Sequence, residues 1–292
     1  MTSRRRIART FVSQPVIEGA GVSLRRAFGF SEAPLLDPFL LLDDFSSDQP
    51  EDYLAGFPWH PHRGIETITM VFTGLIEHSD SLGNTGTISD GEVQWMTAGS
   101  GIIHQEMPRR TTSGRLQGLQ LWANLPAADK MMAPRYRDLT AAAIPEVALG
   151  NGGRVRVIAG EAAGVRGPVG DIVIEPTLAV VDLPAGAMYS HALPADHAVF
   201  AYVLAGAGWF EEEEDDRRAH GAGTTVLYER GGEEVRIAAA GGPLRFLLAA
   251  GRPLGEPVAW RGPIVMNTEE ELDEAFAAYR AGTFQDHGSA GA

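Results

Sequence analysis

Short strand-like segments, each ended by a turn-forming residue, run through most of this 292-residue chain and restrict what it can fold into. Glycine alone contributes 35 residues, about 12% against a usual figure of about 7%. Many short strands cut by Gly, Pro, Asn and Asp predict an all-β sandwich or barrel rather than a helical bundle. The first set of runs comprises Pro38–Leu42, Ile65–Phe72, Gly91–Met96, Leu116–Ala123 and Arg154–Ala159.

A second set of runs begins near Asp171 and has a similar size, so we expect two antiparallel β-barrels, over residues 1–140 and 141–292. The segment Leu125–Val147 is rich in Ala, Pro and charged residues and is expected to connect the two. The second set comprises Ile172–Ile174, Leu178–Leu183, Ala198–Leu204, Thr224–Tyr228, Glu234–Ala238 and Leu244–Ala249.

One short helix is predicted near the C-terminal end, as part of the second domain. Thr268 lies three residues before Glu271, which is a capping-box pattern. Apolar residues then recur at helical spacing, and Gly282 stands where a C-terminal cap belongs. We therefore expect a structural helix over Glu269–Ala281 that packs on a barrel.

Charge and cysteine content exclude several classes of protein. The net charge of −14 at pH 7 disfavours direct nucleic-acid binding, because phosphates would be repelled. With no cysteine, disulfides, iron–sulfur clusters and thiolate zinc sites are excluded, so a metal must use histidine, carboxylate, carbonyl or water. No apolar run suits a signal peptide or a membrane span, and we expect a cytoplasmic monomer without membrane association.

The acidic run Glu211–Asp216 lies between two expected strands of the second half. A solvated hairpin tip is the simpler interpretation. The alternative is a docking surface for a basic protein partner.

Two pairs of metal-binding side chains stand out in the first half. In an extended strand, residues i and i+2 face the same way, so His60 and His62 would point into a barrel together. The same alternation places His104 and Glu106 on one face. If the two strands are neighbours, three imidazoles and one carboxylate converge, a ligand set that suits Fe(II), Mn, Ni, Cu or Zn.

Other residues compete for roles in or near this site. Glu66 lies an even number of residues after His60 and His62, as residues on the same face of a strand do. We therefore expect it to face the cavity as a supporting group or an alternative ligand. His78 is expected at a hairpin tip or behind the ligands. No metal is expected in the second half, which holds the remaining histidines His191, His197, His220 and His287.

Three segments carry a resemblance to a known family: FPWHPHRGIETIT, DGEVQWMTAGSGIIHQEMP and EPVAWRGPIVMNTEEE. The glycine-framed His-x-His followed by a second glycine-framed histidine resembles the cupin superfamily, and the full segments resemble the pirin family within it. The resemblance runs from about Ser13 to Phe284. It implies a bicupin, with Fe(II) bound only in the first barrel by His60, His62, His104 and Glu106.

The resemblance also implies a function. Some pirins are quercetin 2,3-dioxygenases, which cleave flavonols with O₂, and a small aromatic substrate such as a flavonol suits an ion that offsets the charge of its ionised hydroxyl. Glu106 or Glu66 would accept the hydroxyl proton as the catalytic residue. Trp59 and Met96 are candidates to hold a planar substrate.

Two other readings stay open at this point. In the first, the chain is an iron-dependent, redox-sensing regulator that binds a protein partner, as a transcriptional cofactor or a modulator of a metabolic enzyme. Alternatively, the metal serves stability alone, which predicts a closed site.

Overall fold

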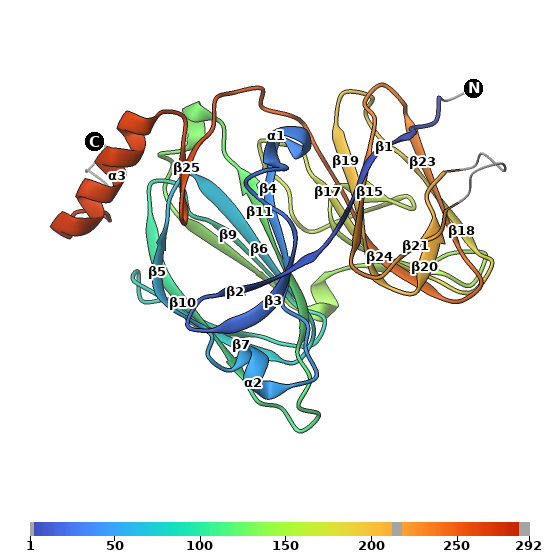
Figure 1. Ribbon diagram of the computed structural model, residues 1–292, viewed down its shortest axis with the longest axis horizontal. Coiled ribbons are helices and arrows are strands. Elements are labelled where there is room, and N and C mark those ends of the chain that lie inside the picture. Colours follow the sequence, from blue (N-terminus) through green and yellow to red (C-terminus); the bar gives the residue numbers. More distant parts are fainter. Residues whose placement is uncertain (1–2, 212–217, 286–292) are drawn as a thin grey trace. The chain divides into compact units, whose positions relative to one another are not determined.

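The computed structural model describes residues 3–211 and 218–285 (Figure 1). His287 and all of the acidic run except Glu211 lie outside these residues. The all-β prediction is confirmed: the described chain is dominated by strands, with two barrels and a short helix near the C-terminal end. No described helix is long and apolar enough to cross a membrane.

The chain forms two compact units, each assembled from separate stretches of sequence. Of the described residues, the first barrel consists of Pro15–Phe30, Phe39–Ala141 and those from Leu254 onward, whereas the second consists of those up to Gln14, Ser31–Pro38 and those within Ala142–Pro253. These units differ from the expected consecutive halves, 1–140 and 141–292. Hydrophobic periodicity identifies strands but not their partners, which here come from distant parts of the chain.

The first barrel contains a seven-stranded and a four-stranded sheet, and the pairings between their strands are antiparallel. The larger sheet has the order β12 (Arg135–Leu139), β9 (Val93–Thr97), β6 (Ile65–Thr73), β11 (Gln117–Asn124), β4 (Phe39–Asp44), β3 (Val22–Phe28) and β2 (Gln14–Glu18). The smaller has the order β5 (Phe57–His62), β10 (Ile102–Arg109), β7 (Leu75–Asp80) and β8 (Thr85–Ile88).

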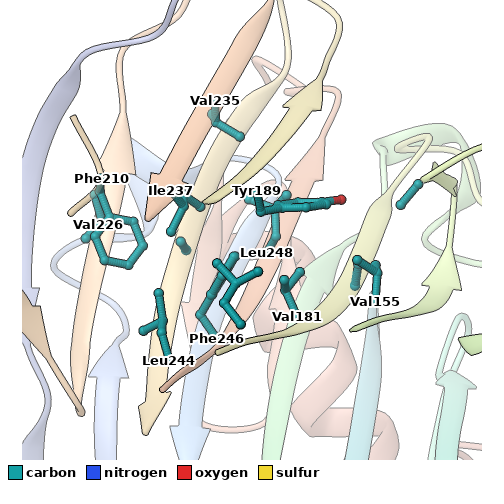
Figure 2. Packing of buried hydrophobic residues seen from close by; sticks show 14 of the residues in the cluster. Val155, Val181, Tyr189, Phe210, Val226, Val235, Ile237, Leu244, Phe246 and Leu248 are labelled. Carbon is teal, nitrogen blue, oxygen red and sulfur yellow. The ribbon is translucent and has the colours of Figure 1, made fainter. Parts of the chain in front are cut away.

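The second barrel repeats this plan. Its seven-stranded sheet has the order β1 (Ile7–Val12), β22 (Thr224–Tyr228), β19 (Ala198–Ala205), β24 (Leu244–Gly251), β17 (Thr177–Leu183), β14 (Arg154–Ala159) and β13 (Glu146–Ala148). Its four-stranded sheet has the order β18 (Met188–Ala192), β23 (Glu234–Ala239), β20 (Ala207–Trp209) and β21 (His220–Gly221). Figure 2 shows its core, where Tyr189, Phe246 and Leu248 pack among aliphatic side chains.

Small elements complete the two units. There are two short hairpins, β15 (Glu161–Ala162) with β16 (Val165–Arg166) and β25 (Ala259–Arg261) with β26 (Ile264–Met266). The helices are α1 (Ala33–Leu36), α2 (Pro50–Tyr53), α3 (Glu269–Ala281) and the 3₁₀ turns η1 (Ala127–Asp129) and η2 (Ala141–Ala143).

The predicted C-terminal helix has the expected bounds, but it belongs to the first barrel. Thr268 and Glu271 form the capping box, and Gly282 ends α3 in the left-handed conformation with a φ of 73°. Leu272 and Ala275 pack against the β25–β26 hairpin, and Ile264 of that hairpin forms a bridge with Arg63 of the first barrel. The third segment of family resemblance therefore lies beside the first two.

One local prediction was wrong, and a second was incomplete. Ile172–Ile174 is a turn region rather than a strand, bounded by Asp171 and Glu175 with φ values of 58° and 47°. Apolar residues in a short run bury equally well in a turn, so their presence did not identify a strand. The expected connection Leu125–Val147 does contain the change from one unit to the other, between Ala141 and Ala142. It also contains β12, which extends the larger sheet of the first barrel.

Candidate metal centre

The two predicted ligand pairs lie on neighbouring strands of the first barrel. His60 and His62 are on β5, and His104 and Glu106 are on β10, which pairs with β5 in antiparallel register. His104 stands directly opposite His60. Because alternate residues of a strand share a face, the pairing brings all four side chains to one side of the sheet.

The three histidines form a compact cluster. One nitrogen of each ring can be chosen so that all three lie within 4.8 Å of one another. The Nε2 atoms of His60 and His62 are 3.1 Å apart, and Oε2 of Glu106 lies 4.0 Å from Nε2 of His104. His62, His104 and Glu106 are buried, whereas His60 is half-buried.

Backbone carbonyls orient two of the three imidazoles. Nδ1 of His60 donates to the Pro58 carbonyl at 2.9 Å, and Nδ1 of His62 donates to the Pro263 carbonyl at 3.1 Å. These bonds leave the lone pair of each ring on Nε2, the nitrogen that faces the cluster. Pro263 lies in the turn of the β25–β26 hairpin, so the C-terminal segment of the chain helps to build the site.

His104 has the strongest need for a partner. Both of its ring nitrogens are buried and neither has a hydrogen-bond partner among the described residues. An unpaired buried polar group costs about 1–3 kcal/mol, and a cation bound by one of the two ring nitrogens would remove that cost for the nitrogen that binds it. The donor set therefore fits a divalent ion of the borderline class.

The imidazoles are suited to act as neutral ligands. Burial lowers the pKa of His62 well below the usual value, with a further contribution from the nearby His60. Burial likewise lowers the pKa of His104 well below the usual value, assisted by His60, His62 and His78. Both rings are thus unprotonated at neutral pH, which is the form that binds metals.

Glu106 is held by residues that the sequence analysis did not identify. Nε2 of Gln120 donates to its Oε2 at 2.9 Å, and Oγ1 of Thr69 donates to its Oε1 at 3.0 Å. The indole N–H of Trp122 donates to Oε1 of Gln120 at 3.1 Å, which fixes the orientation of the amide. Gln120 and Trp122 alternate with fully buried leucines on β11, and that alternation is a signal that could have marked this face as lining the site.

Glu66 does not join the site. It lies on β6, and its carboxylate accepts a hydrogen bond from Oγ1 of Thr97 at 2.6 Å. The described residues that line the cavity beside the histidines include Thr69 but not Glu66. The prediction that Glu66 shares a face with His60 and His62 was wrong because a turn separates the two strands. At Gly64 in this turn φ is 77°, and the alternation of side chains starts anew after it.

The other described histidines are not part of the cluster, although His78 lies behind it, opposite Glu106 on the neighbouring strand. His78 is buried on β7 rather than at a hairpin tip, and its Nε2 lies 2.9 Å from Nε2 of Gln94. In the second barrel, Oη of Tyr189 lies 3.1 Å from Nδ1 of His191. Burial lowers the pKa of His191 to about 4.

A cavity of about 640 Å³ reaches the cluster from within the first barrel. Its lining includes His60, His62 and Glu106 together with Trp59, Trp122 and Trp260. An aromatic series runs from exposed Phe30 through Trp260 and Trp122 to His62, with ring centroids 5.6, 6.0 and 5.1 Å apart. Trp59 lines the cavity as expected, but Met96 is fully buried elsewhere.

Comparison with known proteins gives concordant results. The pirin family model matches residues 21–123, and the model of the pirin C-terminal cupin domain matches residues 178–285. A pirin-like protein from Caulobacter vibrioides is 43% identical over 272 residues, which cover 93% of this chain and 96% of that protein.

Two solved structures extend the comparison. A quercetin 2,3-dioxygenase from Acinetobacter baumannii has a TM-score of 0.87 at 31% identity, covering 97% of this chain and 99% of that one. A bacterial pirin from Escherichia coli in complex with nickel(II) has a TM-score of 0.61 at 20% identity, covering 84% of this chain and 98% of that one. The second likeness concerns the fold alone.

Proposed function

Because this chain belongs to the pirin family, we propose that it is a mononuclear metalloenzyme of the quercetin 2,3-dioxygenase type. The proposal takes Fe(II) as the metal, His60, His62, His104 and Glu106 as its ligands, and a small aromatic molecule such as a flavonol as the substrate. The observation that carries it is the three-histidine cluster, two of whose members are buried, at a cavity lined with tryptophan.

The chemistry divides between the ion and the protein. A bound divalent ion would supply Lewis acidity that favours the ionised form of a coordinated hydroxyl. The protein supplies orientation: the Pro58 and Pro263 carbonyls fix two imidazoles, and the tryptophans offer flat apolar walls to a planar ring. A cavity that reaches the cluster supports this function over a purely structural metal, for which a closed site was expected.

Glu106 is the proposed proton acceptor. Its carboxylate lies beside the cluster and is held by Gln120 and Thr69, so its oxygens are fixed in position before the substrate arrives. Glu66 has no part in the proposal, since its carboxylate bonds to Thr97 instead.

The test begins with anaerobic loading of the purified protein with Fe(II), Mn, Ni, Cu or Zn in separate samples. Nickel belongs in the panel because the Escherichia coli pirin was solved with it. Quercetin and O₂ are then added, and loss of the flavonol absorbance measures turnover. We expect turnover with iron, and we expect His60→Ala and His104→Ala to lose both metal and activity.

His220→Ala is the matched control, because His220 lies on β21 of the second barrel. It should keep metal and turnover. A metal content unchanged in His60→Ala would contradict the ligand assignment. No turnover of several flavonols by the verified iron form would contradict the enzyme proposal and favour the regulatory alternative, for which a partner should bind in a manner that depends on the iron oxidation state.

A further inference from the structure

The charged residues that line the cavity fall into two groups among the described residues. One is Glu106 beside the histidines, and the other is a cluster of Arg26, Asp43 and Glu18. Nε and Nη2 of Arg26 donate to the two oxygens of Asp43, each at 2.8 Å. Nη2 also lies 2.9 Å from Oε1 of Glu18. This bidentate pair has no role in the proposed reaction, although it faces the same cavity.

The register of the larger sheet fixes where this cluster lies. Arg26 pairs with Asp43, Asp43 with Gln120, and Gln120 with Thr69, so these four residues form one row across β3, β4, β11 and β6. Figure 1 shows β4, β11 and β6 running side by side. All four line the cavity. With strands about 4.8 Å apart, Arg26 lies about 10 Å along the row from Gln120.

The row therefore has two functional ends. Gln120 and Thr69 hold Glu106 at the histidine cluster, whereas Asp43 stands one strand and Arg26 two strands from Gln120. Leu24 and Leu41 line the cavity on the same two strands as the ion pair. Apolar neighbours exclude water and strengthen any hydrogen bond made there.

The charge of the cluster determines which groups it can bind. Two carboxylates face a single guanidinium, so the cluster carries a net negative charge and repels anions. Each carboxylate oxygen retains a lone pair after bonding to the arginine and can accept a hydrogen bond from a hydroxyl donor. The side chains of Asp43, Arg26 and Glu18 are 10%, 27% and 42% exposed, so a ligand within the cavity can approach them.

We propose that Arg26, Asp43 and Glu18 form a hydroxyl-binding subsite in the same cavity as the histidine cluster, on the side of β3 and β4, which selects neutral polyhydroxylated aromatic molecules over unhydroxylated or carboxylated ones. This inference rests on the proposed function, because it takes the histidine cluster as the anchor for the other end of the same molecule.

The test uses quercetin and galangin, two flavonols that differ only in the hydroxyl groups on the pendant ring of quercetin. Binding to the metal-loaded protein is measured without O₂, so that turnover does not interfere. The wild type should bind quercetin about tenfold more tightly, as expected for one or two added hydrogen bonds to a carboxylate.

Substitutions in the cluster should reduce the ratio of quercetin affinity to galangin affinity. Asp43→Asn and Glu18→Gln should bring it toward one while leaving galangin affinity within about twofold. The double variant Arg26→Met/Asp43→Leu replaces the ion pair by apolar groups of similar size, which keeps the packing, and should favour galangin. Asp273→Asn is the control, because Asp273 pairs with Arg261 at 2.8 Å on the exposed surface of α3, and it should keep the wild-type ratio.

The possible results separate the two proposals. A wild-type ratio near one, a ratio unchanged in both single variants, or no binding of either flavonol would overturn the subsite. Discrimination that depends on Asp43 and Glu18, without turnover when O₂ is added, would support the subsite and contradict the proposed enzyme function. Turnover by a protein that binds quercetin and galangin equally would support the proposed enzyme function and contradict the subsite.

Discussion

At the residue scale, Gln120 is the side chain on which the position of Glu106 most depends. Gln120→Leu removes the N–H group that donates to the carboxylate at 2.9 Å, so we expect metal affinity to fall at least about tenfold, as is usual for groups that orient ligands. Trp122→Phe keeps an aromatic ring beside His62 and removes the donor to Gln120 while Gln120 keeps its own bond to the carboxylate, so metal affinity should fall less. Competition with a chelator measures the metal affinity of both variants, and Gln117→Leu on the same strand is the control. Equal affinities in Gln120→Leu and the control would contradict this role.

The same residues show what a sequence can and cannot reveal. His60, His62, His104 and Glu106 were predictable because period-2 spacing within one strand determines a shared face. Gln120, Thr69 and Pro263 were not, because their roles depend on which strands pair and on a hairpin about 200 residues from β5. Glu66 was misplaced for a local reason, since a turn at Gly64 interrupts the alternation.

At the scale of elements, one buried lysine attaches the C-terminal hairpin to the strands of the site. Lys130 is the single lysine of the chain, whose other basic residues are arginines, and it is 1% exposed. Its Nζ donates to the Gly64 carbonyl at 2.9 Å, to Oδ1 of Asn124 at 2.7 Å and to the Val265 carbonyl at 3.0 Å. Three acceptors that converge on one nitrogen suit a compact ammonium and not a planar guanidinium.

Substitution of Lys130 should therefore loosen the hairpin that carries Pro263. We expect Lys130→Met to lower the free energy of unfolding by about 3 kcal/mol and to weaken metal binding at His62. Lys130→Arg should fail to restore either property. Denaturant unfolding and metal titration provide the measurements, and full rescue by arginine would show that charge alone is required.

At the scale of the whole molecule, the interleaved units mean that the first 141 residues should not form a complete site. A fragment of residues 1–141 lacks Trp260 and the Pro263 carbonyl, and its β1 loses the partner β22. We expect this fragment to melt at a lower temperature and to bind metal poorly. Residues 15–141 joined by a flexible linker to residues 254–292 should recover binding, because they reunite the first barrel. Full-length affinity in the fragment 1–141 would show that the C-terminal segment is dispensable.

The response of the fold to acid is also a property of the whole molecule, because the pH dependence of unfolding sums over every group that titrates differently in the two states. His191 in the second barrel is 7% exposed, and burial lowers its pKa to about 4 from the usual value of 6.5. Between pH 6.5 and 4 the unfolded chain binds a proton at this residue that the folded chain excludes. The folded state therefore loses stability as the pH falls through this window, by about 3 kcal/mol at most, and the loss levels off below pH 4.

His191→Asn removes this proton-binding group while keeping a polar atom near the Tyr189 hydroxyl. The stability advantage of the wild type over the variant should thus be greatest near neutral pH and should narrow as the pH falls toward 4, because only the wild type carries the linked loss. Denaturant unfolding at a series of pH values measures the difference directly. For His220→Asn, at a half-buried histidine of the same barrel, the stability advantage of the wild type should narrow less as the pH falls. The reason is that a more exposed ring is protonated more easily in the folded state. A wild-type advantage that stays constant from pH 7 to pH 4 would mean that His191 takes up its proton without unfolding, through an opening of the barrel around Tyr189.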